Sequence, residues 1–201
     1  MNIGLANSGN KYRFPKKKYN EDIKRFIASN IYSLKRGVYL LDAGCDSGYL
    51  SSEFIPQYKV IGVDKNYDAI KECQENYPTA KYKVADIRTL PFKDNFFDAI
   101  ILNMVIEHAR EPDELLSELK RVLKKEAIMI ITTPNYASIP WVIIENVWFR
   151  LFERTFKPHL KEIHPSKFNS KTLYRSLSKH FKVVNINKIT YGFTLTAVVS
   201  K

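Results

Sequence analysis

Cysteine and glycine are scarce in this sequence, and none of its hydrophobic runs is long. The two cysteines, Cys45 and Cys73, fit neither a disulfide framework nor a metal-ligand spacing, so we expect no metal site and a cytoplasmic location. Seven glycines and nine prolines exclude a fibrous or linker-like chain. No apolar run reaches the ~20 residues of a membrane span, and no charged-then-apolar leader is present. We therefore expect neither a membrane helix nor a signal peptide.

The 201 residues are 45% hydrophobic, which is enough to build the core of one ordinary domain. The net charge of +11 is unevenly distributed along the chain. Residues 1–39 have nine Lys and Arg against two acids, and residues 150–201 have eleven against two, whereas residues 40–149 have twelve against seventeen. The basic ends suggest an anionic partner, namely a phosphorylated substrate, a membrane surface or nucleic acid. A lysine-rich solvated surface explains the same asymmetry equally well.

Short apolar runs alternate with amphipathic helical stretches along most of the chain. A helical pattern spans residues 19–34 and returns at residues 69–76 and 112–123. Continuously apolar strands that alternate with such helices predict a parallel sheet covered by helices on both faces. The last two runs alternate on either side of Tyr191-Gly192, which predicts a terminal β-hairpin. The expected strands are residues 38–41, 59–63, 82–85, 97–102, 127–131, 181–189 and 193–199.

Each of the first three expected strands is followed by an aspartate: Asp42, Asp64 and Asp86. Ligands of open α/β sheets bind at the carboxyl ends of the strands, so these carboxylates should converge on one crevice. After Asp42 the chain makes a tight strand-to-helix turn, in which Gly44 and Gly48 allow the backbone to approach a ligand. Capping of the following helices is the alternative role for the three aspartates.

The spacing of these acids suits a nucleoside. Asp64 lies 22 residues after Asp42, where an acid on a second strand accepts hydrogen bonds from both ribose hydroxyls. Asp86 could accept the exocyclic amine of adenine, and the N–H of Ile87 could donate to a ring nitrogen. The glycine loop alone is weak evidence, but loop, ribose acid and third-strand acid in this order form a specific set.

This set resembles the motifs of the class I S-adenosylmethionine-dependent methyltransferases, in particular their small-molecule, type 11-like branch. The resemblance covers roughly residues 38–200. It implies a Rossmann-like α/β fold, with a doubly wound seven-stranded sheet in the order 3-2-1-4-5-7-6 whose last strand is antiparallel and with helices on both faces. The similar segments are Leu40–Gly48, Val63–Asp64, Ala85–Ile87, Leu90–Phe92, Phe97–Leu102, Val105–His108, Leu119–Lys124, Thr133–Asn135, and His164 with Phe168–Leu173.

The resemblance also implies a reaction and a set of site residues. S-adenosylmethionine is the implied cofactor and S-adenosylhomocysteine the product. The methyl group would pass to an O or N atom of a small or lipid-like acceptor, and the basic ends would suit an anionic one. The implied cofactor-binding residues are Asp42, Ala43, Gly44, Cys45, Asp46, Gly48, Asp64, Lys65, Asp86, Ile87, Leu102 and Asn103.

Two histidines are the candidate catalytic residues. An acceptor atom that carries a proton needs a base, and histidine is the usual choice. His108 follows the fourth expected strand, and His164 lies in the segment before the last helix. For His108 an orienting role is the alternative, and for His164 a packing or loop role.

One domain is expected over residues 1–201: an arm and helix at 1–37, a cofactor-binding core at 38–135, an apolar and basic insert or lid at 136–170, and a last helix with the hairpin at 171–201. The apolar stretch within the insert is too short to span a bilayer. A lid over the acceptor, an oligomer contact and a membrane-surface helix over residues 140–157 are the three interpretations.

Two departures from the family pattern bear on these expectations. Asp46 replaces the middle glycine of the loop, and its carboxylate could attract the ammonium or sulfonium of the cofactor or repel its carboxylate. Residues 124–127 replace a common Pro-Gly-Gly turn, which should alter only the surface.

Three other functions remain as alternatives. A nicotinamide dehydrogenase is disfavoured because the loop starts with an acid and lacks the Gly-x-Gly-x-x-Gly spacing. A non-catalytic methyltransferase-like module could bind RNA or protein through its basic ends, as Asp46 favours. A methyltransferase acting on RNA or protein is the third, although residues 102–105 lack the Pro-Pro-aromatic motif of base amino-methylation.

Overall fold

The computed structural model describes residues 16–139 and 164–201 of the chain. The expected N-terminal arm and the apolar segment over 140–157 lie outside these residues. The elements are α1 (Lys16–Ile31), β1 (Tyr39–Ala43), the 3-10 turn η1 (Ser51–Phe54), β2 (Lys59–Asp64), α2 (Tyr67–Asn76), β3 (Lys81–Val84), β4 (Phe97–Asn103), η2 (Ile106–His108), α3 (Pro112–Val122), β5 (Leu123–Pro134), α7 (Ser170–Ser178), β6 (Lys182–Ile189), η4 (Thr190–Gly192) and β7 (Thr194–Ser200).

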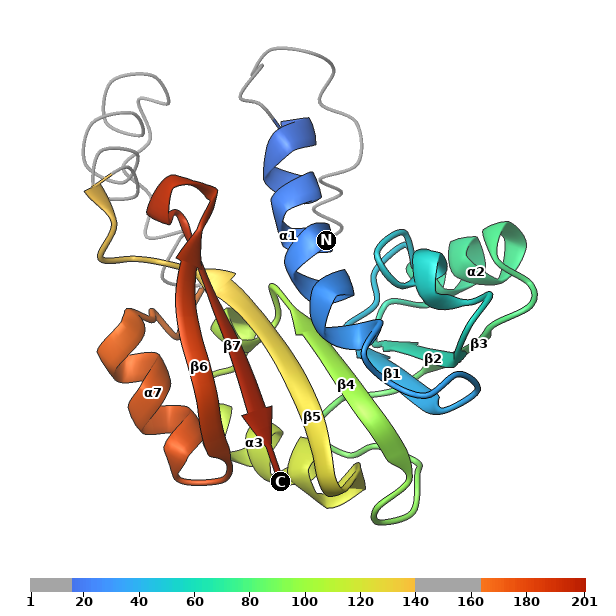
Figure 1. The fold of residues 1–201 in the computed structure, drawn as a ribbon. Helices are drawn as coiled ribbons and strands as arrows, with labels where there is room; N and C mark the ends of the chain where they lie inside the picture. The colour runs from blue at the N-terminus through green and yellow to red at the C-terminus, as the bar shows by residue number, and fades with distance from the viewer. Residues whose placement is uncertain (1–15, 140–163) are drawn as a thin grey trace.

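The strands form one seven-stranded sheet in the order β3-β2-β1-β4-β5-β7-β6, which confirms the order that the family resemblance implied (Figure 1). The first five strands are parallel to one another. The terminal hairpin places β7 between β5 and β6, antiparallel to both. The carboxyl ends of β1 to β5 therefore share one edge of the sheet.

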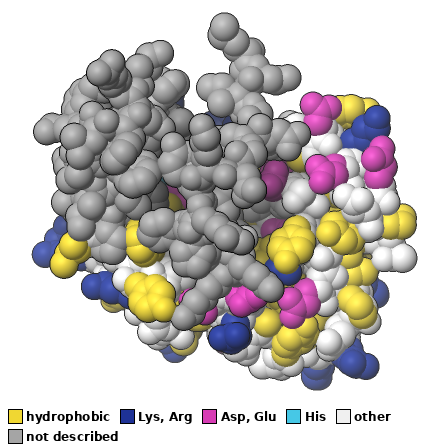
Figure 2. Space-filling model, turned by 90° about the horizontal axis from the view of Figure 1, so that it is seen from above, with side chains coloured by type: hydrophobic (Ala, Val, Ile, Leu, Met, Phe, Trp, Pro, Cys, Tyr) yellow, Lys and Arg dark blue, Asp and Glu magenta, His cyan; other side chains and the backbone are white. Residues whose placement is uncertain are grey.

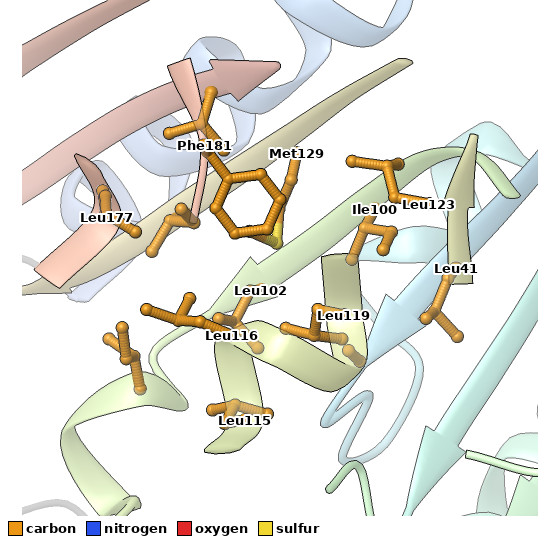
Figure 3. Packing of buried hydrophobic residues seen from close by; sticks show 14 of the residues in the cluster. Leu41, Ile100, Leu102, Leu115, Leu116, Leu119, Leu123, Met129, Leu177 and Phe181 are labelled. Carbon is orange, nitrogen blue, oxygen red and sulfur yellow. The ribbon is translucent and has the colours of Figure 1, made fainter. Parts of the chain in front are cut away.

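Alternate residues of the strands pack on opposite faces, which explains the continuous apolar runs. On one face Leu41, Ile100 and Met129 pack against α3 and α7 (Figure 3). On the other face Leu40 and Ile101 join the core cluster that includes the buried side of α1. Helices thus cover both faces, and the interior strands of the sheet are buried, whereas the edge strands β3 and β6 are largely exposed.

Two elements differ from their expected form. A single 3-10 turn, η1, follows the glycine loop, so this loop has no long helix behind it. Strand β5 starts directly after α3, at Leu123, because the chain turns to extended conformation there (φ −74°, ψ 136°). None of the helices within the two described ranges is long and apolar enough to cross a membrane.

Candidate active site

The loop after β1 is bound to the end of β2. The N–H groups of Gly44 and Cys45 both donate to the carbonyl oxygen of Val63, at 2.8 and 3.0 Å. Gly44 has φ +80°, and a Cβ added there would lie 2.5 Å from Cγ2 of Val105. Gly48 has φ +71°, and its Cβ would lie 3.0 Å from Sγ of Cys73. Backbone conformation and close packing within the protein therefore require glycine at both positions, in addition to the approach of a ligand that the sequence predicted.

Asp42, at the end of β1, is a buried carboxylate with an unsatisfied oxygen. Asp42 is only 2% exposed, and its Oδ2 has no hydrogen-bond partner among the described residues. Burial raises its pKa to about 6; the Ser51 hydroxyl opposes the rise, and the carboxylates of Asp64 and Asp46 add to it. A buried carboxylate of this kind lowers the stability of the fold, and a cationic ligand would compensate its charge.

Asp64, at the end of β2, fixes the loop beside it. Its Oδ2 accepts the N–H of Asp46 at 3.1 Å, and its Oδ1 accepts the N–H of Asn66 at 2.9 Å. Asp46 has a left-handed backbone (φ 45°) and an exposed side chain, so it takes the conformation that a glycine would normally supply. The neighbouring Lys65 is exposed, whereas Ala43 is fully buried in the core.

Asp86 follows β3, next to Asp64, because the N–H of Ala85 donates to the Asp64 carbonyl at 3.0 Å. Its carboxylate accepts from the Arg88 backbone N–H at 2.9 Å and from the Arg88 guanidinium, with Nη2 2.6 Å from Oδ2. The Arg88 side chain, more than any other group, lowers the pKa of Asp86. The adenine acceptor expected from the sequence is therefore already engaged by a surface arginine. Ile87 is half-buried against the core.

The two cysteines pack beneath the surface of the glycine loop and help to hold it in place. Cys45 and Cys73 are buried together with Ile70, and Tyr82 packs against them. The Cys73 thiol donates to the Asp46 carbonyl at 3.0 Å. Burial raises the pKa of the Cys73 thiol to about 11 and also raises that of Cys45, so neither is primed as a nucleophile.

At the end of β4, Leu102 is buried and Asn103 is held by β5. The Thr132 hydroxyl donates to Oδ1 of Asn103 at 2.6 Å. Met104 then takes a left-handed backbone (φ 53°), and its N–H donates to the carbonyl of Thr132 at 3.1 Å. This reversal leads the chain through Val105 into η2, which carries His108.

His108 and His164 lie together, with two residues that the sequence analysis did not select. The imidazole centroids are 4.7 Å apart in an edge-to-face arrangement. The Tyr136 hydroxyl forms a short contact with Nδ1 of His164. Glu107 is 1% exposed, and its Oε2 accepts the Thr133 hydroxyl at 3.0 Å. We name Glu107, His108, Tyr136 and His164 the imidazole cluster.

Long-range backbone contacts hold the imidazole cluster in place. The N–H of Ser166 donates to the Glu107 carbonyl at 3.1 Å, and its hydroxyl donates to the Ala109 carbonyl at 2.8 Å. These bonds fasten the segment after His164 to η2. Burial raises the pKa of Glu107 to about 7, although the Thr133 hydroxyl opposes the rise. The adjacency of Glu107 to His108 was the only signal for it in the sequence, and Tyr136 had none.

The strand-end acids and the imidazole cluster meet through Val105. The side chain of Val105 contacts the position of Gly44, and Val105 directly precedes η2. Figure 2 views the molecule from the end at which β4 and β5 terminate, and several acidic side chains are visible on this face beside the grey residues. The two groups thus occupy adjoining parts of one edge of the sheet.

Comparison with known proteins gives this arrangement a family. Residues 41–131 match a sequence model described as a methyltransferase domain. This segment has the sequence of a methyltransferase domain. S-adenosylmethionine is the cofactor that goes with this domain. The matched residues include Asp42, Asp64 and Asp86 as well as η2.

Two curated relatives are about one third identical in sequence to this chain over the aligned residues. A probable S-adenosylmethionine-dependent methyltransferase of Mycobacterium tuberculosis is 31% identical over 48% of this chain and 35% of its own length. The ubiquinone biosynthesis O-methyltransferase of Pelagibacter ubique is 36% identical over 61% of this chain and 52% of its own length. The chain therefore spans about a third to a half of the length of these relatives.

Solved structures extend the likeness of fold to most of the chain. The PH0226 protein of Pyrococcus horikoshii superimposes with a TM-score of 0.73 at 18% identity, over 92% of this chain and 90% of that one. The β6–β7 hairpin and α7 thus belong to the same architecture as the methyltransferase domain.

Proposed function

We propose that this chain transfers a methyl group from S-adenosylmethionine to an oxygen or nitrogen atom of a small or lipid-like anionic acceptor. One observation carries the proposal. The buried Asp42, whose Oδ2 has no partner among the described residues, lies beside Asp64 in a carboxylate-lined end of the sheet that adjoins the imidazole cluster. The molecule thus combines a site for a cationic nucleoside with groups that can hold or move a proton.

The residues at the ends of β1 to β3 fit the cofactor by their chemistry. S-adenosylmethionine supplies a methyl group activated by a positively charged sulfonium. The carboxylates of Asp42, Asp46 and Asp64 raise the negative potential of the loop, which favours a cation there. Asp64 retains acceptor capacity on both oxygens for ribose hydroxyls, since each carboxylate oxygen has two lone pairs.

The imidazole cluster would act on the acceptor. An imidazole beside the acceptor atom can accept its proton as the nucleophile attacks, a contribution of about 10²- to 10⁴-fold in rate. The Tyr136 contact fixes the ring of His164, and the edge-to-face contact positions His108 beside it. Because methyl transfer needs in-line approach, this fixed geometry contributes as much as the proton transfer does.

Two observations support the class of acceptor. The Pelagibacter ubique relative is named as an O-methyltransferase of ubiquinone biosynthesis, which favours oxygen as the methylated atom. The basic residues near both ends of the chain, eleven Lys and Arg against two acids in residues 150–201, suit an acceptor with an acidic or phosphorylated part.

Calorimetric titration of the purified chain with S-adenosylhomocysteine, and in parallel with NAD, is the first test. We expect one S-adenosylhomocysteine to bind per chain and NAD to give no heat of binding. Binding of NAD alone would overturn the proposal in favour of a dehydrogenase. RNA binding that weakens with salt, without methyl transfer, would replace it with a non-catalytic module.

Radioactive methyl transfer from S-adenosylmethionine to a panel of phenolic, carboxylic and amine acceptors is the second test. The double variant His108→Ala, His164→Ala should lose about 10²-fold or more of the rate with the accepted compound, while the affinity for S-adenosylhomocysteine changes by less than about twofold. His180→Ala is the matched control, because His180 contacts Asp113 of α3 and is not a member of the imidazole cluster. Equal rates in the double variant and the control would remove the histidines from the mechanism.

A further inference from the structure

Three side chains of the imidazole cluster form a group of metal-ligand type that their sequence spacing does not reveal. Glu107, His108 and His164 each offer one ligand atom, and these atoms all lie within 4.8 Å of one another. Glu107 is buried, His164 half-buried and His108 exposed, so the group opens from the core towards solvent. Sequence analysis predicted no metal site from the spacing of the two cysteines, and it gave no signal for this group because His164 lies far along the chain from Glu107 and His108.

The donor set selects a kind of metal. Two imidazoles and one carboxylate suit zinc and divalent iron, whereas magnesium and calcium prefer sites made of oxygen alone. Three protein ligands are also the usual number for a catalytic zinc ion, which keeps its fourth position for water or substrate. The exposed side of the group, at His108, is where that fourth position would face.

The surroundings of the ligands are those that a metal site requires. The Thr133 hydroxyl donates to Glu107 at 3.0 Å and orients its carboxylate. Tyr136 contacts Nδ1 of His164, and a hydrogen bond at one ring nitrogen commonly accompanies metal ligation through the other. Thr133 lies on β5 and Tyr136 lies two residues beyond its end, so both supports come from one interior strand of the sheet and the residues just after it.

The separations are slightly wider than those of an occupied site. Ligand atoms about 2.0–2.1 Å from a tetrahedral zinc ion lie about 3.4 Å from each other. Separations of up to 4.8 Å therefore close with side-chain movements of about one ångström. His108 is exposed and can make such a movement without disturbing the core.

We propose that Glu107, His108 and His164 bind one divalent transition-metal ion of the zinc class, with an open coordination position for an oxygen atom of the acceptor. The metal binding itself is independent of the proposed function, and only the role of the open position rests on methyl transfer. An ion there would hold an acceptor oxygen and acidify a hydroxyl bound to it. In the metal-bound chain both histidines would therefore serve as ligands, and the ion would replace a free imidazole as the group that activates the acceptor.

Metal titration of the chelator-treated chain tests the proposal. Zn²⁺ and Mg²⁺ are titrated by calorimetry, and Co²⁺ by its visible absorption. We expect one Zn²⁺ per chain, weaker binding of Mg²⁺, and a tetrahedral or five-coordinate Co²⁺ spectrum. In His108→Gln, His164→Gln and Glu107→Gln the Zn²⁺ affinity should fall by about tenfold or more, whereas His180→Gln should bind like the parent chain.

Two results would overturn the proposal. One is the absence of stoichiometric Zn²⁺ binding by the parent chain. The other is a Zn²⁺ affinity in His164→Gln equal to that of His180→Gln. The S-adenosylhomocysteine titration of the same samples separates this proposal from the previous one, because that binding involves β1 to β3 and should be unchanged by the chelator. Loss of nucleoside binding with intact Zn²⁺ binding would refute only the methyltransferase activity.

Discussion

The two ends of the site are built in different ways. Along β1 to β3, each acid lies at or just beyond the end of its own strand, and the parallel register of the sheet brings Asp42, Asp64 and Asp86 to one edge. The imidazole cluster instead combines η2, the end of β5 and the segment before α7, which only long-range bonds such as that from Ser166 to Glu107 hold together. The first end is determined by topology, and the second by tertiary contacts.

The same contrast appears within the acids. Asp42 and Asp86 occupy equivalent strand ends, yet burial raises the pKa of Asp42 and Arg88 lowers that of Asp86. A position at a strand end therefore does not determine the electrostatic state of the carboxylate. Its neighbours do, and each can be removed separately.

The contact between the two ends is the most sensitive point. Gly44→Ala should lower the free energy of unfolding by about 2–5 kcal/mol, because a Cβ 2.5 Å from Val105 adds overpacking to the strain of φ +80°. Gly37→Ala is the matched control, since Gly37 has φ +79° and nothing within 4 Å of its Cβ. It should cost about 1–2 kcal/mol. Urea unfolding measures both, and equal losses would show that Val105 yields without cost.

The charge state of Asp42 should be visible in stability. Its pKa in the fold is about 6 against 3.8 for an ordinary aspartate, so the folded chain binds the proton more tightly than the unfolded chain does. The contribution of Asp42 to the free energy of unfolding therefore falls as pH rises from 4 to 7, by up to about 3 kcal/mol. Asp42→Asn should be stabilising by a similar amount at pH 8 and near neutral at pH 4.

Asp86→Asn provides the opposite control in the same unfolding experiment. Because Arg88 lowers the pKa of Asp86, that carboxylate stabilises the fold above the pKa of the unfolded chain and loses this effect as pH falls through its folded value. The substitution should lower stability at pH 8. A stabilising Asp86→Asn, or a pH-independent Asp42→Asn, would contradict the contrast between the two acids.

The strand-end acids could be predicted from the sequence, whereas most of the imidazole cluster could not. The strands, the three acids and the position of the glycine loop were predicted, because apolar periodicity and strand-end position are local signals, whereas the strand order was implied by the family resemblance. The closeness of His108 and His164 was not, although both were selected, and Glu107 and Tyr136 were missed. Nothing local distinguishes a buried glutamate that serves a site from one at a helix start. The pairing of Asp86 with Arg88 also went unforeseen, since a side-chain rotamer decides it.

Ionisation of Asp42 should also separate the two forms of the cofactor. S-adenosylmethionine has a sulfonium charge that S-adenosylhomocysteine lacks, while their amino-acid parts titrate alike. The ratio of their affinities should therefore rise in favour of S-adenosylmethionine by about three- to tenfold between pH 5 and pH 8. In Asp42→Asn the ratio should stay constant. A ratio that rises equally in the variant would assign the effect to Asp46 or Asp64.

The smallest expected effect concerns the exposed partner of Asp86. Arg88→Ala removes the guanidinium that donates to both carboxylate oxygens, at 3.1 Å from Nε to Oδ1 and 2.6 Å from Nη2 to Oδ2, and so leaves Asp86 to an adenine amine. Exposed ion pairs are weak, so the affinity for S-adenosylhomocysteine should rise by only about two- to threefold. Arg25→Ala, at a loose surface pair with Asp22, is the control and should change nothing. A loss of affinity in Arg88→Ala would instead mean that Arg88 holds Asp86 in its binding orientation, and that this acid, like Asp64, needs a protein partner to serve the cofactor.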